Sequence, residues 1–282
     1  ILITPQAFTT IDFEYLQNQF GPEYNILLTG GQVETRKELL DYFISNNIHG
    51  SLIGAEPIDE EVFSKCPNLK MLSRFGIGYD SIDIESARSH DVSVAVVPDI
   101  NSDAVARHTL SLLLALTNNT IEQRVLSERN LWRKSFNLSP EHTTIGLIGL
   151  GSIGRIFATM CDFLGYNIEY YSRTKKRNCK YKYHDSISSL IKSSDIVSLH
   201  IPLVNETKNI IDKTKLDLMD GKYLINTSRG KLINEAYLYN KLQKGHILGA
   251  GLDVFVNEPS TGISLDLRKL NKNDLKQLTK EL

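Results

Sequence analysis

The sequence predicts an α/β protein made of two parallel-sheet domains with a cleft between them. Short apolar runs alternate with amphipathic helical patterns, which is typical of parallel strands covered by helices. This alternation occurs twice, once in about the first hundred residues and once after them. The length of 282 residues exceeds the roughly 150 residues of a common single domain, so it also favours two domains.

The first domain is expected over residues 1–98. Its candidate strands are short apolar runs separated by helical patterns, at residues 1–4, 25–30, 50–55, 69–76 and 92–97. Either Asp80 or Ser81 is expected to cap a helix that runs to about His90.

The second domain is expected over residues 99–260, and it begins with an apolar pattern at 104–119 that predicts a mostly buried helix. Its candidate strands form a second series, at residues 143–151, 167–172, 195–202, 222–228 and 247–255. The tail at 261–282 is atypical because its leucines stand among charged residues. This pattern predicts a solvated helix or a truncated end.

Composition argues against several classes of partner. The net charge of −1 gives no basic surface for nucleic acid or anionic lipid, and the apolar run at 110–116 is too short to cross a bilayer. The three cysteines have neither metal-ligand nor paired-disulfide spacing, so we expect no metal site. A cytoplasmic location is the natural expectation for such a chain.

A glycine-rich turn carries the strongest chemical signal. The segment from Gly149 to Gly154 reads GLGSIG and matches G-x-G-x-x-G between an apolar run and a helical pattern. Gly149 is expected to make the tight turn, Gly151 to admit a pyrophosphate, and Gly154 to let helix and strand touch. The N–H groups of Ser152 and Ile153 are expected to bind the anion. This context predicts a Rossmann dinucleotide-binding domain, whereas an empty glycine-rich turn is the alternative.

The next predicted strand ends without the acidic residue that an NAD site uses to bind the ribose hydroxyls. Ser172, Arg173 and Thr174 stand there instead, with three more basic residues after them. A guanidinium between two hydroxyls suits a 2′-phosphate, so the sequence predicts NADP(H) as the preferred cofactor, with NAD(H) possible. The alternative interpretation is a solvated basic turn.

Five segments together resemble the D-isomer-specific 2-hydroxyacid dehydrogenase family, which includes D-3-phosphoglycerate dehydrogenases and hydroxypyruvate/glyoxylate reductases. They are GIGYDSID, GLGSIG, LHIPL, NTSRG and DVFVNEP, and they occur in this order between about residues 70 and 259. The resemblance implies a flavodoxin-like substrate-binding domain before a Rossmann domain. It also implies a homodimer that pairs through the helix at about 104–119.

The resemblance also implies site residues. Arg229 would hold the substrate carboxylate and polarise the 2-keto oxygen, and the backbone N–H groups of Ile77 and Gly78 would bind the same carboxylate. Asp253 would bind the nicotinamide carboxamide, and Glu258 would keep a neighbouring histidine protonated. Three further residues would line the cofactor, namely Ile201, Thr227 and Ser228. The alternatives are a structural ion pair for Arg229 and a solvated carboxylate for Glu258.

Two departures from the family pattern stand out. Members continue after Glu-Pro to a Pro-His pair whose histidine is the general acid–base, but residues 259–282 contain no histidine. General acid catalysis contributes ~10²–10⁴-fold, so its loss predicts cofactor binding with little turnover. His200 is the only substitute that the sequence offers, and a weak one. Arg107 stands where members commonly carry Glu, and the adjacent His108 is expected to be a helix-packing residue.

The sequence therefore predicts an NAD(P)-dependent oxidoreductase of a small D-2-hydroxy acid, or of a 2-keto acid such as hydroxypyruvate, glyoxylate or 3-phosphohydroxypyruvate. Arg74, just before the GIG turn, favours a phosphorylated substrate, whereas the SRT turn favours the hydroxypyruvate/glyoxylate class. Activity is expected to be impaired, through a truncated, frameshifted or incomplete terminus. The alternative is a non-catalytic dinucleotide-binding protein of the corepressor or sensor kind.

Overall fold

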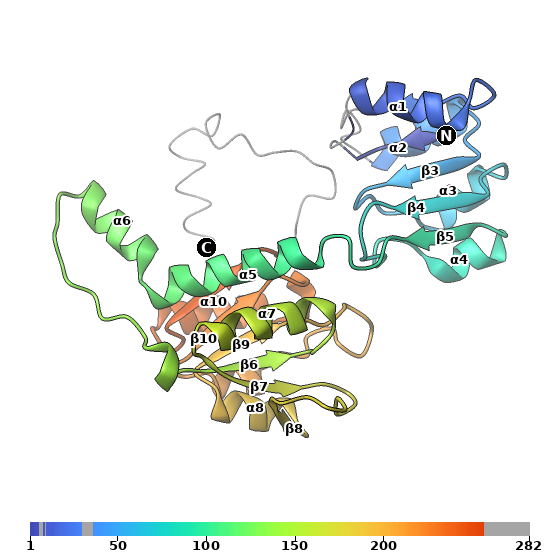
Figure 1. Cartoon of the computed structure of the whole chain (residues 1–282). Helices are drawn as coiled ribbons and strands as arrows, with labels where there is room; N and C mark the ends of the chain where they lie inside the picture. Colours follow the sequence, from blue (N-terminus) through green and yellow to red (C-terminus); the bar gives the residue numbers. More distant parts are fainter. Residues whose placement is uncertain (6–7, 9, 30–35, 257–282) are drawn as a thin grey trace. The chain divides into compact units, whose positions relative to one another are not determined.

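The computed structural model describes residues 1–5, 8, 10–29 and 36–256, which are drawn as coloured ribbon in Figure 1. The chain forms two compact units, one ending at Ile100 and the other beginning at Asn101. Each unit has its own parallel sheet and its own buried apolar residues. The expectation of two parallel-sheet α/β domains is confirmed.

The first unit is a five-stranded parallel sheet with strand order β2-β1-β3-β4-β5, which is the flavodoxin-like order. Its strands are β1 (Leu2–Ile3), β2 (Leu27–Leu28), β3 (Gly50–Ile53), β4 (Met71–Arg74) and β5 (Ser93–Val96). Its helices are α1 (Thr10–Phe20), α2 (Arg36–Ser45), α3 (Glu60–Lys65) and α4 (Ile84–Ser89).

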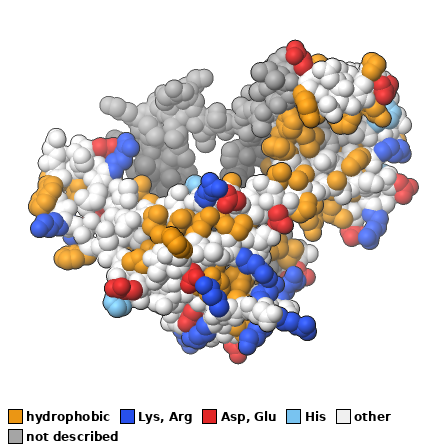
Figure 2. Space-filling model, in the orientation of Figure 1, with side chains coloured by type: hydrophobic (Ala, Val, Ile, Leu, Met, Phe, Trp, Pro, Cys, Tyr) orange, Lys and Arg blue, Asp and Glu red, His pale blue; other side chains and the backbone are white. Residues whose placement is uncertain are grey.

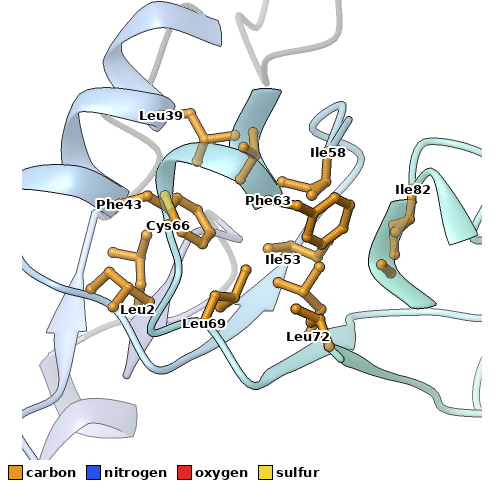
Figure 3. Close-up of a cluster of buried hydrophobic side chains, with 14 of the residues drawn as sticks. Leu2, Leu39, Phe43, Ile53, Ile58, Phe63, Cys66, Leu69, Leu72 and Ile82 are labelled. Atoms are coloured by element: carbon orange, nitrogen blue, oxygen red, sulfur yellow. The ribbon is translucent and has the colours of Figure 1, made fainter. Parts of the chain in front are cut away.

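One apolar cluster holds three of these helices on the sheet. Phe43 of α2 and Phe63 of α3 are almost fully buried, and they pack in one cluster with Leu2, Ile53 and Leu72 from the strands (Figure 3). Full burial of one side chain of this size stabilises the fold by about 1.5–3 kcal/mol. The sheet is therefore a firm support for the loops at its strand ends.

The start of α4 differs from the prediction. The helix begins at Ile84, and its N-cap is Asp83, whose carboxylate accepts a hydrogen bond from the N–H of Ser86 at 3.1 Å. The expectation that Asp80 or Ser81 caps this helix is therefore wrong. Asp, Ser and Thr all cap helices well, so a sequence with several of them in a row does not say which one is used.

The second unit is a six-stranded parallel sheet with strand order β11-β10-β9-β6-β7-β8, the order of a Rossmann domain. Its strands are β6 (Thr144–Ile148), β7 (Asn167–Tyr171), β8 (Lys182–His184), β9 (Ile196–Leu199), β10 (Tyr223–Asn226) and β11 (Gly249–Leu252). Its helical elements are α5 (Ser102–Thr117), α6 (Thr120–Glu128), η1 (Pro140–His142), α7 (Ser152–Phe163), α8 (Ile187–Ser193), α9 (Lys213–Asp217), η2 (Gly230–Leu232) and α10 (Glu235–Gln243).

Both faces of this sheet are covered. Neighbouring residues of a strand point to opposite faces, so Leu147 and Ile148 of β6 belong to different apolar clusters. Leu147 packs with Phe157 of α7 and with α5, whereas Ile148 packs with Leu190 of α8 and with α10. Figure 1 shows α5 and α7 together along one side of the sheet. Ligands can therefore reach the sheet only at its edges and strand ends.

Helix α5 buries less of its surface than the sequence predicts. Its fully buried residues include Ala106, Thr109, Leu113 and Thr117, which are spaced by three or four and form one stripe. The opposite side of the helix is exposed. The helix is therefore only partly buried, and not mostly buried as predicted. Most leucines of the run at 110–116 contact the core, whereas residues such as Asp103 and Arg107 face away from it.

Candidate functional site

The strands of the second unit end at one level. The pairs Tyr171–Ile148, Ile148–Leu199, Leu199–Asn226 and Asn226–Leu252 are all in register. The five residues that follow these strand ends therefore form a row along the carboxyl edge of the sheet, in the order Ser172, Gly149, His200, Thr227, Asp253. Four of these five were predicted as cofactor-binding residues from the sequence.

The row crosses the point where the strand order reverses. After β6 the chain proceeds through β7 and β8 on one side, and then returns to place β9, β10 and β11 on the other. The crevice outside such a reversal is where open α/β sheets bind their ligands. Gly149 and His200 follow the two strands that flank it.

The glycine turn is built around Gly149. Its φ of +103° is a conformation that L side chains rarely adopt, and its N–H donates to the carbonyl of Tyr171 at 2.9 Å. A Cβ here would lie 2.3 Å from the carbonyl oxygen of His200, so the turn is in close backbone contact with the residue that follows β9. A Cβ on Gly154 would lie 2.5 Å from the carbonyl oxygen of Gly149. Both glycines thus allow the close approach that the motif predicts.

The middle glycine faces open space instead. A Cβ on Gly151 would meet no atom within 4 Å, although the residue stands at the N-cap of α7. No side chain of the described residues caps this helix, so the first N–H groups, including those of Ser152 and Ile153, have no acceptor in the helix itself. A 12-residue helix that starts uncapped beside open space fits the pyrophosphate of a dinucleotide.

The turn after β7 carries the predicted 2′-phosphate residues. Ser172 is half-buried and its hydroxyl donates to the carbonyl of Thr174 at 2.8 Å, whereas Arg173 and Thr174 are exposed. Figure 2 shows Lys and Arg side chains (blue) on this part of the unit. The structure brings these three residues together at the end of the row nearest β8.

The loop that carries Arg229 is organised by Asn226, which is fully buried. The Asn226 side-chain N–H donates to the carbonyl of Arg229 at 2.9 Å, and its oxygen accepts the N–H of Ser228 at 3.0 Å. The Ser228 hydroxyl donates to the carbonyl of Leu199 at 2.8 Å, which ties the loop to β9. A guanidinium on so well-fixed a backbone can recognise a planar carboxylate with defined geometry.

Arg229 itself is half-buried, and one of its Nη1 protons is donated to the carbonyl of Ser228 at 2.7 Å. Thr227, beside it, is nearly buried, and its hydroxyl lies 2.9 Å from the hydroxyl of Thr109 on α5. Ile201, on the other side of the loop, is half-buried against the cluster that includes Ile148. The predicted lining residues therefore belong to one continuous surface of this unit.

Asp253 follows β11 and is half-exposed. Its N–H donates to the carbonyl of Asn226 at 3.0 Å, and its carboxylate lies 3.2 Å from Nε2 of His108. The expectation that His108 only packs its helix is wrong, since the side chain is 49% exposed and pairs with this carboxylate. The adjacent Arg107 forms an ion pair with Asp103 one helical turn earlier.

His200 is a poor proton donor in this setting. Its ring lies against Phe157, with centroids 5.3 Å apart, and Nε2 is 3.0 Å from the Ser198 hydroxyl. Nδ1 is buried without a partner among the described residues. Burial lowers the pKa of His200 to about 4, so the ring is neutral at neutral pH.

The remaining predicted residues belong to the first unit or lie outside the described residues. Ile77, 39% exposed, and Gly78 follow β4 in the first unit, where the Arg74 guanidinium donates to the carbonyl of Phe75. Glu258 and the tail at 261–282 lie outside the described residues, which end in this region at Val256.

Two residues of the site escaped the sequence reasoning. Asn226 begins the NTSRG segment, but only its burial shows that it organises the loop. Glu235, in the first turn of α10, accepts the N–H of Val256 at 2.7 Å and so holds the segment after Asp253. A carboxylate just after an Asn cap was the only available signal.

Within the described part of the chain, no group of three or more His, Cys, Asp or Glu side chains could hold a metal ion. None of its helices combines the length and the apolar character needed to cross a membrane.

Comparison with known proteins agrees with this geometry. Residues 110–273 match the model of the D-isomer specific 2-hydroxyacid dehydrogenase, NAD binding domain. The chain belongs to the D-isomer-specific 2-hydroxyacid dehydrogenase family.

The family's curated members include close matches. A glyoxylate reductase of Thermococcus litoralis is 35% identical over 217 residues, which cover 72% of this chain and 66% of the relative. A glyoxylate reductase of Pyrococcus horikoshii is 33% identical over 272 residues, covering 90% of this chain and 80% of the relative. The first of these matches thus spans slightly less than two thirds of the relative's length.

One similar solved structure matches nearly all of the chain. The D-lactate dehydrogenase of Aquifex aeolicus, complexed with NAD and lactic acid, superposes with a TM-score of 0.81 at 26% identity. The match covers 99% of this chain and 84% of the enzyme. The family assignment and the Rossmann order of the second sheet together establish a pyridine-nucleotide-binding domain.

Proposed function

We propose that this protein is an NADP(H)-dependent oxidoreductase that interconverts a small D-2-hydroxy acid and its 2-keto acid. The observation that carries the proposal is the row at the carboxyl edge of the second sheet. It places the glycine turn and the Arg229 loop on either side of the strand-order reversal. The named relatives that the chain resembles reduce glyoxylate or act on lactate, which supports the substrate class.

The cofactor assignment rests on the two ends of the row. At one end, the Ser152 and Ile153 N–H groups beside Gly151 would bind the pyrophosphate, and Arg173 would bind a 2′-phosphate. At the other end, the Asp253 carboxylate would accept from the carboxamide. When bound, the nicotinamide would supply or accept the hydride of the reaction. We expect NAD(H) to bind less tightly than NADP(H), because the turn after β7 has no carboxylate that could accept hydrogen bonds from the ribose hydroxyls of NAD.

Arg229 would act on the substrate. Its guanidinium would hold the carboxylate of the 2-keto acid and stabilise the negative charge that develops on the 2-oxygen. The N–H groups of Ile77 and Gly78 in the first unit would bind the same carboxylate, so residues 1–98 would form the substrate-binding domain. Glu258 would orient the histidine that acts as general acid–base.

The choice among substrates depends on whether Arg74 can bind a phosphate group. We expect hydroxypyruvate or glyoxylate to be preferred over 3-phosphohydroxypyruvate, because the Arg74 guanidinium is engaged with the carbonyl of Phe75 beside it. A phosphorylated substrate would have to compete with that bond.

One assay tests the proposal. The full chain is mixed with NADPH and hydroxypyruvate, glyoxylate or phosphohydroxypyruvate, and NADPH absorbance is followed, with nucleotide affinity measured separately by calorimetry. Turnover that Arg229→Ala abolishes, with NADPH affinity retained, would support the enzyme. Absence of NADPH binding would contradict the proposal outright.

A second candidate is a non-catalytic dinucleotide-binding protein of the corepressor or sensor kind, which would bind the nucleotide with the same glycine turn and the same uncapped start of α7. Tight nucleotide binding without any turnover of the three keto acids would establish it. Retention of Arg229 on a loop that the buried Asn226 holds by two hydrogen bonds supports the enzyme instead.

We also propose that the protein is a homodimer. Helix α6 has no buried residue, although Ile121 and Val125 give it an apolar side, and the segment after it exposes Trp132 by 84% and Phe136 by 96%. Figure 2 shows orange side chains on this part of the unit. Exposed large apolar residues gathered on one segment are typical of an association surface. A second copy of this chain would cover them.

A cytoplasmic location accompanies these proposals. The three cysteines are free, and burial raises the pKa of Cys161 to about 12, which suppresses its reactive thiolate form.

A further inference from the structure

The turn that carries Arg173 is anchored by a buried tyrosine. Tyr170, the fourth residue of β7, is fully buried, and its hydroxyl accepts the backbone N–H of Lys176 at 3.0 Å. The side chain thus reaches beneath the exposed turn and holds its far end. Cys179 is partly buried against the same apolar cluster as Tyr170.

A second tyrosine holds the near end. The hydroxyl of Tyr183, on the edge strand β8, donates to the carbonyl of Ser172 at 3.5 Å. The rings of Tyr183 and Tyr170 are neighbours, with centroids 5.5 Å apart. The Nζ of Lys175 lies 5.9 Å above the Tyr183 ring, which adds a cation–π contact to the turn.

Arg173 and Thr174 therefore occupy the apex of a turn that is fixed at both ends. Strand β7 ends at Tyr171, and the turn after it is held by the two tyrosine hydroxyls and by the bond from the Ser172 hydroxyl to the Thr174 carbonyl. Charged donors bind an anion more tightly when their backbone is already ordered, because less conformational entropy is lost on binding.

We propose that Tyr170 is a positioning residue that sets the preference for a dinucleotide bearing a 2′-phosphate, with Tyr183 as its weaker partner. The proposal rests on the proposed function, since it concerns the same nucleotide. Tyr170 acts through the backbone of the turn and not by contact with the ligand, because its side chain is buried under that turn.

The test is Tyr170→Phe, which removes one oxygen and keeps the ring. Affinities of the full chain for NADPH and NADH are measured by calorimetry, and adenosine 2′,5′-bisphosphate and 5′-AMP serve as probes that lack the nicotinamide. Losing one hydrogen bond should weaken NADPH and the bisphosphate by about three- to tenfold, and should leave NADH and 5′-AMP within about twofold. Tyr166→Phe is the matched control, because Tyr166 is also buried, in the same apolar cluster, before the opposite end of β7.

A second readout needs no nucleotide. The Lys176 amide proton should exchange with solvent faster in Tyr170→Phe than in the wild type, and at the wild-type rate in Tyr166→Phe. Unchanged exchange, an unchanged NADPH-to-NADH ratio, or an equal loss of both nucleotides would overturn the positioning role. If Tyr170→Phe does not fold, Tyr183→Phe is measured in the same way and should show a smaller loss of selectivity; no loss would overturn the role.

The outcome for the wild type separates the two proposals. A wild-type protein without preference for NADPH would overturn the cofactor assignment in the proposed function, and the positioning role would fall with it. A wild-type preference that Tyr170→Phe leaves undiminished would overturn the positioning role alone.

Discussion

The side-chain amide of Asn226 donates to the main-chain carbonyl of Arg229 at 2.9 Å, while its oxygen accepts the N–H of Ser228. Both bonds are made by a residue with no exposed surface. The direction of the Arg229 side chain is therefore set by a neighbour that itself reaches no ligand.

Asn226→Ala tests this relationship. It removes both hydrogen bonds that the buried Asn226 side chain makes to the partly buried Arg229 carbonyl and Ser228 N–H, so we expect the free energy of unfolding to fall by about 1–3 kcal/mol and keto-acid binding to weaken. Urea unfolding and inhibition by a 2-keto acid measure the two effects. Asn240→Ala removes an exposed Asn that donates only to the Ala236 carbonyl, and it should change neither. Unaltered stability in the Asn226 variant would refute the claim that this residue organises the loop.

Arg173→Ala tests the choice of cofactor. Removing a charged donor should weaken NADPH binding by about 1.5–3 kcal/mol and leave NADH almost unchanged. Calorimetric titration of both nucleotides gives the comparison. Arg124→Ala removes an exposed arginine that pairs with Glu128 on α6, and serves as the charge-matched control. Equal losses for both nucleotides would count against the 2′-phosphate assignment.

Two glycines of one turn should respond in opposite ways to alanine. Gly149→Ala places a Cβ 2.3 Å from the His200 carbonyl oxygen at a φ of +103°, so we expect a loss of stability of at least ~2 kcal/mol. Gly151→Ala meets no atom within 4 Å, so we expect normal stability but weaker nucleotide binding. Thermal unfolding and NADPH titration of both variants decide this. Normal NADPH affinity in Gly151→Ala would place the pyrophosphate elsewhere.

The neutral, buried ring of His200 predicts a loss of stability in mild acid. Its pKa is lowered to about 4, whereas an unfolded histidine titrates near 6.5, so the unfolded state binds more protons between these values. Stability should therefore fall as the pH falls from about 6.5 towards 4. Urea midpoints across this range should show a shallower fall for His200→Gln, and the exposed His142→Gln should behave like the wild type. Parallel curves for all three proteins would contradict the burial argument.

The dimer proposal has a built-in reporter, because Trp132 is the only tryptophan of the chain. A dimer that covers it should emit at shorter wavelength than free tryptophan, and dilution should shift the emission to the red. Trp132→Ser with Phe136→Ser should give a monomer by light scattering. Phe163→Ser, which removes an equally exposed aromatic residue on α7, should remain dimeric. A wild-type monomer at micromolar concentration would contradict the proposal.

Much of the second unit was predictable because its strands are buried on both faces. Continuous apolar runs such as TIGLI in β6 indicate such strands directly. The edge strand β8 was missed, because Lys182, Tyr183 and His184 carry polar groups and form no apolar run. Their places are fixed by partners instead: Glu169 accepts from both Lys182 and His184.

Those parts of the candidate site that are formed by one short motif could be predicted from the sequence. Contacts between segments that are distant in the sequence could not. The glycine turn needs only local sequence, and its three glycines lie as the motif predicts. The pairing of His108 with Asp253 joins residues 145 positions apart in the sequence, and no local pattern marks it. Long-range pairs of this kind follow from the packing of α5 beside β10 and β11.

Gly230 lies where the segment after Arg229 meets the segment after Asp253. A Cβ there would lie 2.0 Å from the carbonyl carbon of Phe255, and Glu235 fastens the N–H of Val256 beside it. The backbone after Arg229 and the backbone after Asp253 therefore interlock and must shift together. Any side chain larger than glycine at this position would push the two segments apart, and it would displace Arg229 and Asp253 at the same time.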